Sequence, residues 1–243
     1  MIDVSVVVPT HNRRRILPQA VNAILRQQGV AIELVVVDDG SSDGTEAWLA
    51  GLAATDTRVK VVRHAEPRFI SAARNAGIAH AGGRWIAFCD DDDLWAPDKL
   101  RLQLAAMRAG SERWSCTGVA VVDEDLGIIG HHHVEGGDVL ARLLQSNRIP
   151  TGSSVIAERG VLRDVGGFDP GLRGSEDWDL WIRLALHSPL AAVDRPLIAY
   201  RLGRQSLSMN VHPMRAGRLT IAERYAALAA AHGVTSDEAG HER

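Results

Sequence analysis

Residues 85–93 read Trp-Ile-Ala-Phe-Cys-Asp-Asp-Asp-Asp, an apolar run that ends in four consecutive carboxylates. The apolar part is typical of a strand that is buried on both faces of a parallel sheet. In an open α/β sheet, ligands bind beyond the carboxyl ends of the strands. The run Asp90–Asp93 therefore stands where a ligand site is expected.

These four carboxylates repel one another, and no lysine or arginine is interleaved among them. Such a cluster lowers the stability of the fold unless a cation or water screens it. A divalent ion that prefers oxygen ligands, Mg²⁺ or Mn²⁺, is the natural partner. The structural alternative is a solvated acidic loop that caps the following helix. The position directly after a buried strand favours the ligand site.

Strand-like and helix-like patterns alternate through the first half of the chain. The expected strands are residues 4–8, 33–37, 59–63 and 85–89. The expected helices are residues 16–25, a segment that begins at Thr45, and residues 71–81 and 97–109. This βαβα order predicts a parallel sheet that is covered by helices.

The second half is less regular. Strands are expected at residues 115–122, 153–157 and 197–202, and helices at 138–145, 178–186 and 213–231. No internal repeat and no long linker divides the chain. We therefore expect one domain over residues 1–231, made of a first half (1–114), a second half (115–210) and a C-terminal helix (213–231). The polar tail 232–243 is expected to be disordered.

The composition is that of an ordinary globular protein, with 46% hydrophobic residues and a formal net charge of -3. This charge excludes a global positive field that would recruit nucleic acid. Two cysteines, Cys89 and Cys116, are too few for a disulfide framework. No signal-peptide pattern and no apolar stretch of about 20 residues is present. We expect a cytoplasmic protein and leave weak contact with a membrane surface open.

Two further acidic segments stand next to expected elements. The turn at residues 38–42, Asp-Asp-Gly-Ser-Ser, ends a buried strand. A carboxylate there can bind a base N–H or a ribose hydroxyl. The structural alternative for this turn is an Asx turn that caps the next helix. Glu176 and Asp177 precede a tryptophan-rich helix. The helix dipole favours acids there, and one of them can also act as general base for a hydroxyl nucleophile. Trp178 and Trp181 form either a sugar-stacking face or part of the core.

Six segments, in order, resemble the motifs of the family-2 glycosyltransferases. They are VSVVVPTHNR (4–13), VVDDGSSDGT (36–45), ARNAG (73–77), FCDDDD (88–93), GGFD (166–169) and EDWDLWIR (176–183). Each motif is weak by itself, but six in order over nearly the whole chain are a specific signal.

The resemblance implies the GT-A fold, an α/β fold with a Rossmann-like, mostly parallel central sheet, flanking helices and an acceptor-side extension. Residues 1–114 would bind the nucleotide sugar and residues 115–210 the acceptor. The implied reaction is an inverting, metal-dependent transfer of a sugar from a nucleotide diphosphate sugar, with a UDP-sugar expected, to an acceptor hydroxyl. The transfer would be non-processive, because the Gln-X-X-Arg-Trp signature and the membrane spans of processive members are missing.

The resemblance also implies roles for individual residues. Asp177 would be the general base, and Glu176 would support it or contact the acceptor. The nucleotide-sugar-binding residues would be Pro9, Thr10, Asn12, Asp39, Arg74, Asp90 and Asp91. The ligands of Mn²⁺ or Mg²⁺ would be Asp92, Asp90 and His212, although the tetra-Asp run leaves two registers open, Asp90/Asp92 and Asp91/Asp93. Positive charge for the leaving diphosphate would come from Arg201 and Arg204.

Two other functions remain as alternatives. A sugar-phosphate nucleotidyltransferase uses similar carboxylates, but the arginines at 13–15 lack the glycines of a triphosphate loop. A non-catalytic nucleotide-sugar-binding protein would need no acid at Asp177. The run His131–His133 is expected to be a loop or an edge strand, because three consecutive side chains cannot face one ion. A saccharide, a lipid-linked glycan, a peptide and a small molecule are all compatible acceptors.

Overall fold

A computed structural model describes residues 2–202 and 211–234 of the chain. Its first half contains β1 (Val4–Thr10), α1 (Leu17–Leu25), β2 (Ile32–Asp39), α2 (Thr45–Thr55), β3 (Val59–His64), α3 (Phe69–His80), β4 (Trp85–Phe88), β5 (Leu94–Trp95) and α4 (Lys99–Arg108). Its second half contains β6 (Trp114–Val122), β7 (Ile128–His132), α5 (Leu140–Gln145), the 3₁₀ turn η1 (Gly152–Ser154), β8 (Ile156–Glu158), α6 (Arg159–Asp164), α7 (Glu176–Ala185), β9 (Leu190–Arg201), α8 (Val211–Arg224) and α9 (Ala226–Ala231).

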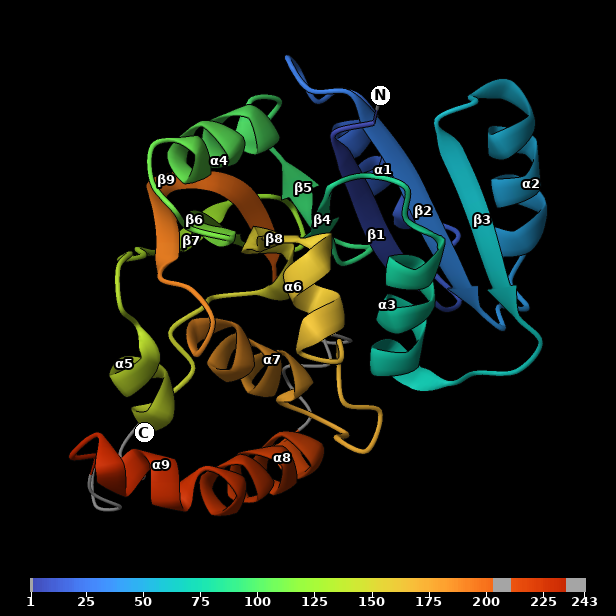
Figure 1. Cartoon of the computed structure of the whole chain (residues 1–243). Coiled ribbons are helices and arrows are strands. Elements are labelled where there is room, and N and C mark those ends of the chain that lie inside the picture. Colours follow the sequence, from blue (N-terminus) through green and yellow to red (C-terminus); the bar gives the residue numbers. More distant parts are fainter. Residues whose placement is uncertain (1, 203–210, 235–243) are drawn as a thin grey trace.

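The described strands form one continuous, curled sheet in the order β3-β2-β1-β4-β8-β6-β9-β5, with β7 paired to β6. The strands β3, β2, β1 and β4 are parallel neighbours, as the βαβα pattern predicts. Beyond β4 the sheet is mixed, because β8 pairs antiparallel with both β4 and β6 whereas β6 and β9 are parallel. The same sheet thus runs through both expected halves of the chain (Figure 1).

Helices cover both faces of the parallel part of the sheet. Successive residues of a strand point to opposite faces. Val4, Val6 and Val8 accordingly pack in one apolar cluster with residues of α1, α2 and α4. Val7 points to the other face, against α3, where a Cβ on Gly77 would overlap the Val7 side chain. Gly77 therefore allows the close approach of α3 to β1, and this approach brings α3 to the edge of the sheet where the acidic run lies.

The expected strand 153–157 is wrong at its start. Residues 152–154 form the turn η1, and the strand β8 covers Ile156–Glu158. The hydroxyl of Thr151 accepts the N–H of Ser153, and the hydroxyl of Ser154 donates to the carbonyl of Thr151 at 2.7 Å. Such local hydrogen bonds offer the backbone an alternative to a sheet ladder, which apolar patterning does not reveal.

The last strand is longer than expected, because β9 begins at Leu190 and not at residue 197. It runs through Pro196, and proline cannot donate a hydrogen bond to a sheet ladder. The register between β6 and β9 shifts at Gly118, which lies opposite Pro196, and pairing resumes beyond it. This shift in register allows a proline to stand inside the long strand β9.

Two short elements, β5 and α6, were not expected. The strand β7 contains His131 and His132 and pairs with β6 alone among the described strands, so the edge-strand alternative for the histidine run is confirmed for these two residues, and His133 lies just beyond the strand. The expected helix 213–231 is two helices, α8 and α9, with Tyr225 between them. Both lie beside α7 and α5 at the lower side of Figure 1. The tail beyond residue 234 lies outside the described residues.

We predict that Gly77→Ala lowers the free energy of unfolding by about 1–3 kcal/mol, because the added methyl group overpacks the contact with Val7. Gly51→Ala is the matched control, since a Cβ at Gly51 in α2 meets open space. That control should be neutral or stabilising by up to about 1 kcal/mol. Urea unfolding measures both variants. Equal stability of Gly77→Ala and the wild type would contradict the close-packing argument.

Candidate functional site

The carboxyl ends of β1 and β4 place two polar groups side by side. Pro9 and Thr10 end β1, and the Thr10 hydroxyl donates a hydrogen bond to Asp91 Oδ2 at 2.7 Å. Arg13 Nε lies 3.7 Å from Asp91 Oδ1. Burial and the charge of Asp92 raise the pKa of Asp91 to about 7, although Thr10 and Arg13 oppose this. The acidic run is therefore tied to the turn after β1.

The last two carboxylates of the run differ in their surroundings. Asp93 is fully buried, and its Oδ1 accepts the N–H of Arg201 at 3.3 Å. Burial, followed by the charges of Asp90 and Asp92, raises the pKa of Asp93 well above its usual range. Asp92 is partly buried, and its carboxylate accepts no side-chain or backbone hydrogen bond from any other described residue. Asp92 is thus the carboxylate that the described protein leaves open to a ligand.

A buried arginine joins this run to the second half of the chain. Arg74 in α3 is 3% exposed. Its Nη2 donates to Asp90 Oδ1 at 2.8 Å, and its Nη1 donates to Glu176 Oε1 at 2.9 Å. Burial by itself lowers the pKa of Arg74, but the charges of Asp90 and Glu176 outweigh it and hold this pKa above its usual range. The guanidinium also lies over the ring of Phe168, 5.0 Å from its centroid.

Asp177 lies next to this ion pair, in the first turn of α7. Its carboxylate accepts the N–H of Trp178 at 2.7 Å. Burial and the charge of Glu176 raise the pKa of Asp177 to about 7, and the charge of Arg74 opposes the rise. A carboxylate with a pKa near neutrality is suited to accept a proton from a hydroxyl group.

The turns after β1 and β2 are bonded to each other. Asn12 has a φ of 54°, a left-handed conformation that asparagine adopts more readily than most residues. Its N–H donates to the Ser41 hydroxyl at 2.9 Å, and its side-chain oxygen accepts the N–H of Ser42 at 2.8 Å. The ring Nδ1 of His11 lies 2.7 Å from the carbonyl oxygen of Asp39. Backbone strain of this kind is concentrated at functional sites.

Asp39, at the end of β2, binds the backbone at the start of α3. Its carboxylate accepts the N–H groups of Arg68 and Phe69 at 2.9 and 2.8 Å, and it lies 2.6 Å from Nδ1 of His64. The structural alternative for this turn is present in part, because Asp38 Oδ1 accepts the N–H of Ser41 at 3.0 Å and so forms an Asx-type turn. The expected cap of the next helix is not made by this turn, since the N–H of Thr45 in α2 bonds to Asp43, whereas Asp39 binds the first N–H groups of α3. Asp39 fixes the helix that carries Arg74.

The tryptophans of α7 belong to the core. Trp181 is fully buried and stacks on Trp114, with 6.1 Å between ring centroids. The indole N–H of Trp178 donates to the carbonyl of Leu143 at 2.6 Å. The sugar-stacking interpretation of these two side chains is wrong, because their rings complete the apolar cluster beneath the site.

The C-terminal candidates lie partly outside the described residues. Arg201 ends β9, donates its N–H to Asp93, and its charge acts to lower the pKa of Asp92. Arg204 lies outside the described residues. His212 falls in the first turn of α8, but its side chain also lies outside the described part of the structure. The other implied site residues come together at one edge of the sheet.

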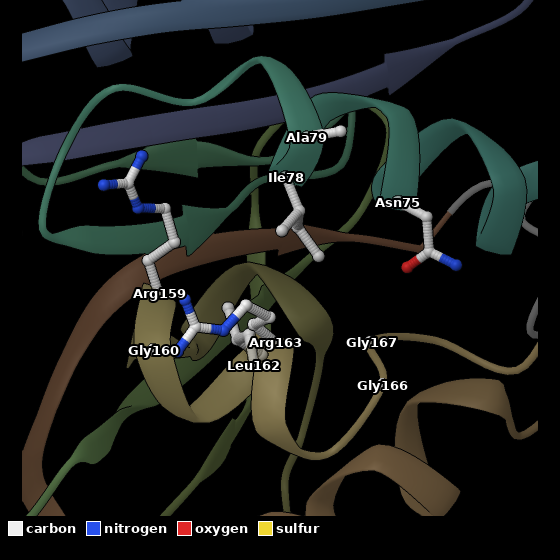
Figure 2. A pocket seen from close by; sticks show the side chains of 9 residues that line it. All are labelled: Asn75, Ile78, Ala79, Arg159, Gly160, Leu162, Arg163, Gly166 and Gly167. Atoms are coloured by element: carbon white, nitrogen blue, oxygen red, sulfur yellow. The ribbon is translucent and has the colours of Figure 1, made fainter.

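A cavity between α3 and α6 is separate from the acidic cluster. It has a volume of about 690 Å³ and lies between α3 and α6, where Asn75, Ile78, Arg159 and Arg163 are among its lining residues (Figure 2). Arg159 is already engaged there, because its Nη1 donates to the carbonyl of Ala81 at 2.6 Å. None of the residues implied as catalytic, nucleotide-binding or metal-binding lines this cavity.

Comparison with known proteins identifies the family. The model described as "Glycosyl transferase family 2" matches residues 5–166, more than half of the chain. The chain belongs to glycosyl transferase family 2. The resemblance read from the six motifs is thereby confirmed, and the predicted enzyme class, glycosyltransferase, is that of the family.

Several curated glycosyltransferases are similar in sequence. An uncharacterized glycosyltransferase of Rickettsia conorii is 30% identical over 201 residues, which cover 82% of this chain and 33% of that protein. The UDP-Glc:alpha-D-GlcNAc-diphosphoundecaprenol beta-1,3-glucosyltransferase WfgD of Escherichia coli is 27% identical over 85% of this chain and 80% of its own length. A putative teichuronic acid biosynthesis glycosyltransferase, TuaG of Bacillus subtilis, is 38% identical over 50% of this chain and 48% of its own length. The chain spans about a third of the Rickettsia proteins that it matches.

Solved structures show the same fold. TarS 1–349 of S. aureus in complex with UDP-GlcNAc superimposes with a TM-score of 0.74 at 18% identity, covering 90% of this chain and 65% of that chain. The complex of the same protein with UDP gives a TM-score of 0.70 at 22% identity over 83% and 61% of the two chains. The predicted α/β class and GT-A fold are confirmed.

Two residues beside this candidate site had been given no role. Asn75 clamps the loop before α7, because its side chain donates to the carbonyl of Phe168 at 2.7 Å and accepts the N–H of Phe168 at 2.9 Å. The Ser153 hydroxyl accepts the N–H of Asp90 at 2.8 Å. Asn75 stands in the ARN motif, so its place beside Arg74 was an available signal. Ser153 had no such signal, because its contact depends on the turn η1.

We predict that Arg74→Ala lowers the free energy of unfolding by about 3–5 kcal/mol, because it leaves Asp90 and Glu176 without their shared cation. Arg58→Ala is the control, since Arg58 pairs with Asp56 at the surface and its loss should cost less than about 1 kcal/mol. Thermal and urea unfolding compare the two variants. A similar small effect for both variants would show that the buried ion pairs of Arg74 contribute no more to the free energy of unfolding than a surface pair does.

Proposed function

We propose that the chain transfers a sugar from a nucleoside diphosphate sugar, with uridine as the nucleoside, to an acceptor hydroxyl with inversion at the anomeric carbon. The observation that carries the proposal is the ion-pair bridge of Arg74. It holds Asp90, from the donor-side run, and Glu176, next to Asp177, on one guanidinium. Carboxylates that suit donor binding and proton transfer are thus assembled in one place.

The proposed reaction is a direct displacement. The acceptor oxygen forms a bond to the anomeric carbon while the bond from that carbon to the diphosphate oxygen breaks. The proton of the acceptor hydroxyl passes to the Asp177 carboxylate, and the nucleoside diphosphate leaves with the electron pair of the broken bond. Attack on the face opposite the leaving group inverts the configuration. Asp177 serves this role because its raised pKa makes it a competent proton acceptor near neutral pH.

The donor nucleotide is proposed to lie over the turns after β1 and β2. Pro9, Thr10 and Asn12 border the position, and Asp39 provides carboxylate oxygens next to it. The complexes of TarS with UDP and UDP-GlcNAc support a uridine donor for a chain with the same fold. The glucosyltransferase name of WfgD supports a UDP-sugar in the same way.

A divalent cation, Mg²⁺ or Mn²⁺, fits the residues present. Asp92 has a carboxylate without a partner among the described residues, and Asp90 keeps one oxygen beyond its bond to Arg74. We therefore favour the register Asp90/Asp92, with His212 as a further candidate ligand. No three His, Cys, Asp or Glu side chains in the described ranges converge as a complete metal site. That arrangement suits an ion held by one or two carboxylates and completed by substrate phosphates and water. When bound, the ion would stabilise the charge that develops on the leaving diphosphate.

The acceptor is proposed to be a growing cell-surface glycan, including one carried on a lipid diphosphate. The support is the printed names of relatives, which include a diphosphoundecaprenol-dependent glucosyltransferase and proteins of teichuronic acid and succinoglycan biosynthesis. Within residues 2–202 and 211–234, every helix is too short or too polar to cross a bilayer. Peripheral association with a membrane is thus part of the proposal.

A thermal-shift panel with Mn²⁺ tests the donor assignment. UDP and UDP-sugars should raise the melting temperature more than guanosine or thymidine diphosphates, since ligands that bind the native state stabilise it.

Product analysis distinguishes a glycosyltransferase from a nucleotidyltransferase. A glycosyltransferase releases the nucleoside diphosphate, whereas a nucleotidyltransferase releases pyrophosphate, and pyrophosphate as product would overturn the proposal.

We predict that Asp177→Asn lowers the rate of UDP release from UDP-GlcNAc or UDP-glucose by about a hundredfold or more, because the proton acceptor is lost. Binding of UDP with Mn²⁺ should survive in this variant, since Asp177 acts on the acceptor side. Isothermal calorimetry and a UDP-release assay measure the two properties. Loss of UDP binding in a normally folded variant would argue against the base role.

Asp92→Ala should weaken the Mn²⁺-dependent binding of UDP by about tenfold or more, because the open carboxylate would be a metal ligand. Binding without metal should change little. Asp164→Ala is a control, since Asp164 is an exposed acid that pairs with Arg163 outside the site. Unchanged affinity of Asp92→Ala for UDP in the presence of Mn²⁺ would refute the metal assignment.

A further inference from the structure

The turn that carries the proposed base has an unusual backbone. Gly174 and Ser175, directly before α7, have φ values of 143° and 57°. The left-handed conformation is unfavourable for a residue with a Cβ, so the surroundings must hold Ser175 in place. Within the described part of the chain, the Asp177 carboxylate takes its hydrogen bond from the N–H of the neighbouring Trp178. The backbone of this turn therefore sets the direction of the carboxylate.

The C-terminal helix α8 lies directly against that turn. Gly217 is buried in the middle of α8, and a Cβ built on it would overlap the carbonyl oxygen of Gly174 and lie 3.3 Å from the Cβ of Ser175. Glycine is a poor helix former. Its presence here allows the backbone of α8 to touch the backbone of the turn without an intervening side chain.

A buried carboxylate of α7 binds the same helix about two turns beyond Gly217. Asp179 of α7 is fully buried and accepts hydrogen bonds from Arg224 Nη1 at 2.7 Å and from the Tyr225 hydroxyl at 2.9 Å. Its other oxygen accepts two bonds from Arg183, at 2.9 and 2.6 Å. Arg224 also donates to Asp169 at 2.7 Å, in the loop that leads to α7.

The contacting residues form one face of α8. Gly217, Ile221 and Arg224 are spaced by four and three positions, which places them on the same side of a helix. Ile221 is 2% exposed and belongs to the apolar cluster that also contains Trp178 and Trp181. This face of α8 thus makes a backbone contact at Gly217, apolar contacts at Ile221 and hydrogen bonds at Arg224.

We propose that α8 is a positioning element for the base: Gly217 and the Asp179–Arg224–Tyr225 hydrogen bonds hold the turn at 174–177 so that Asp177 faces the reacting centre. This inference rests on the proposed role of Asp177. The helix itself contributes no group to the chemistry. It acts through the backbone of Gly174 and Ser175, and its loss would misdirect the base while leaving the donor-side residues of β1, β2 and β4 in place.

The direct test is Gly217→Ala, with Gly51→Ala as the matched control. Both changes replace a helical glycine by a better helix former, but only the Cβ at Gly217 meets the Gly174 carbonyl. Steady-state release of UDP from UDP-GlcNAc with Mn²⁺ gives kcat and the donor KM. In Gly217→Ala, kcat should fall about tenfold or more with the donor KM unchanged, because misplacement of a catalytic group affects the chemical step. Gly51→Ala should match the wild type.

Two further variants keep the test decisive if Gly217→Ala does not fold. Tyr225→Phe removes one hydrogen bond to Asp179, and Arg224→Lys removes the planar fork that joins Asp179 and Asp169. Both should lower kcat without raising the donor KM. In the background of Asp177→Asn, none of these changes should lower the residual rate further, since the base on which they act is absent.

Wild-type kcat in Gly217→Ala, Tyr225→Phe and Arg224→Lys would overturn the positioning role while Asp177→Asn still abolished release. Equal loss of kcat and of donor affinity would also overturn it, because that pattern indicates general disruption of the fold. Full activity of Asp177→Asn would instead refute the proposed base, and that result is distinct from either of the others.

Discussion

Two carboxylates from distant parts of the chain share one buried cation. Glu176 stands 102 positions from Arg74 in sequence, yet both it and Asp90 accept hydrogen bonds from the same guanidinium. A buried charge is tolerated only when it is paired and its hydrogen bonds are made. The ion pairs of Arg74 therefore fix the distance between the strand ends of the parallel sheet and the start of α7. Every chemical role assigned to the acids depends on this distance.

The position of Arg74 is in turn set by its helix. Asp39 holds the first N–H groups of α3, and Gly77 allows the helix to touch β1. On the far side, Asn75 bonds to both backbone groups of Phe168, and the Arg74 guanidinium covers the ring of that residue. One helix thus links the donor-side turns to the loop that leads to α7. This explains physically why the ARN and GGFD motifs accompany the acidic motifs in one sequence.

The sequence predicted the elements whose signals are local. The strands β1, β2 and β4 consist mainly of apolar residues, and the acids at or after the ends of β2 and β4 lie at the expected edge of the sheet. Features that depend on distant partners were missed. The strand β9 continues past Pro196 because of an irregularity in its pairing with β6, and η1 forms with the help of two hydroxyl groups, those of Thr151 and Ser154. Likewise, the bonds of Asp179 to α8 span more than forty positions, and no spacing rule foretells them.

The distribution of charge in the acidic run explains how a stable fold can keep a reactive site. Arg74 offsets Asp90, Thr10 and Arg13 stabilise Asp91, and the N–H of Arg201 meets Asp93. Asp92 alone of the four has no such partner among the described residues, and burial together with the charge of Asp90 raises its pKa. Burial and the neighbouring carboxylates raise the pKa of Asp91 and Asp93 as well, so the repulsion is shared along the run, and a donor complexed with a divalent cation would relieve it. Because relief of this repulsion is available only to the folded protein, donor binding and stability are coupled in this site.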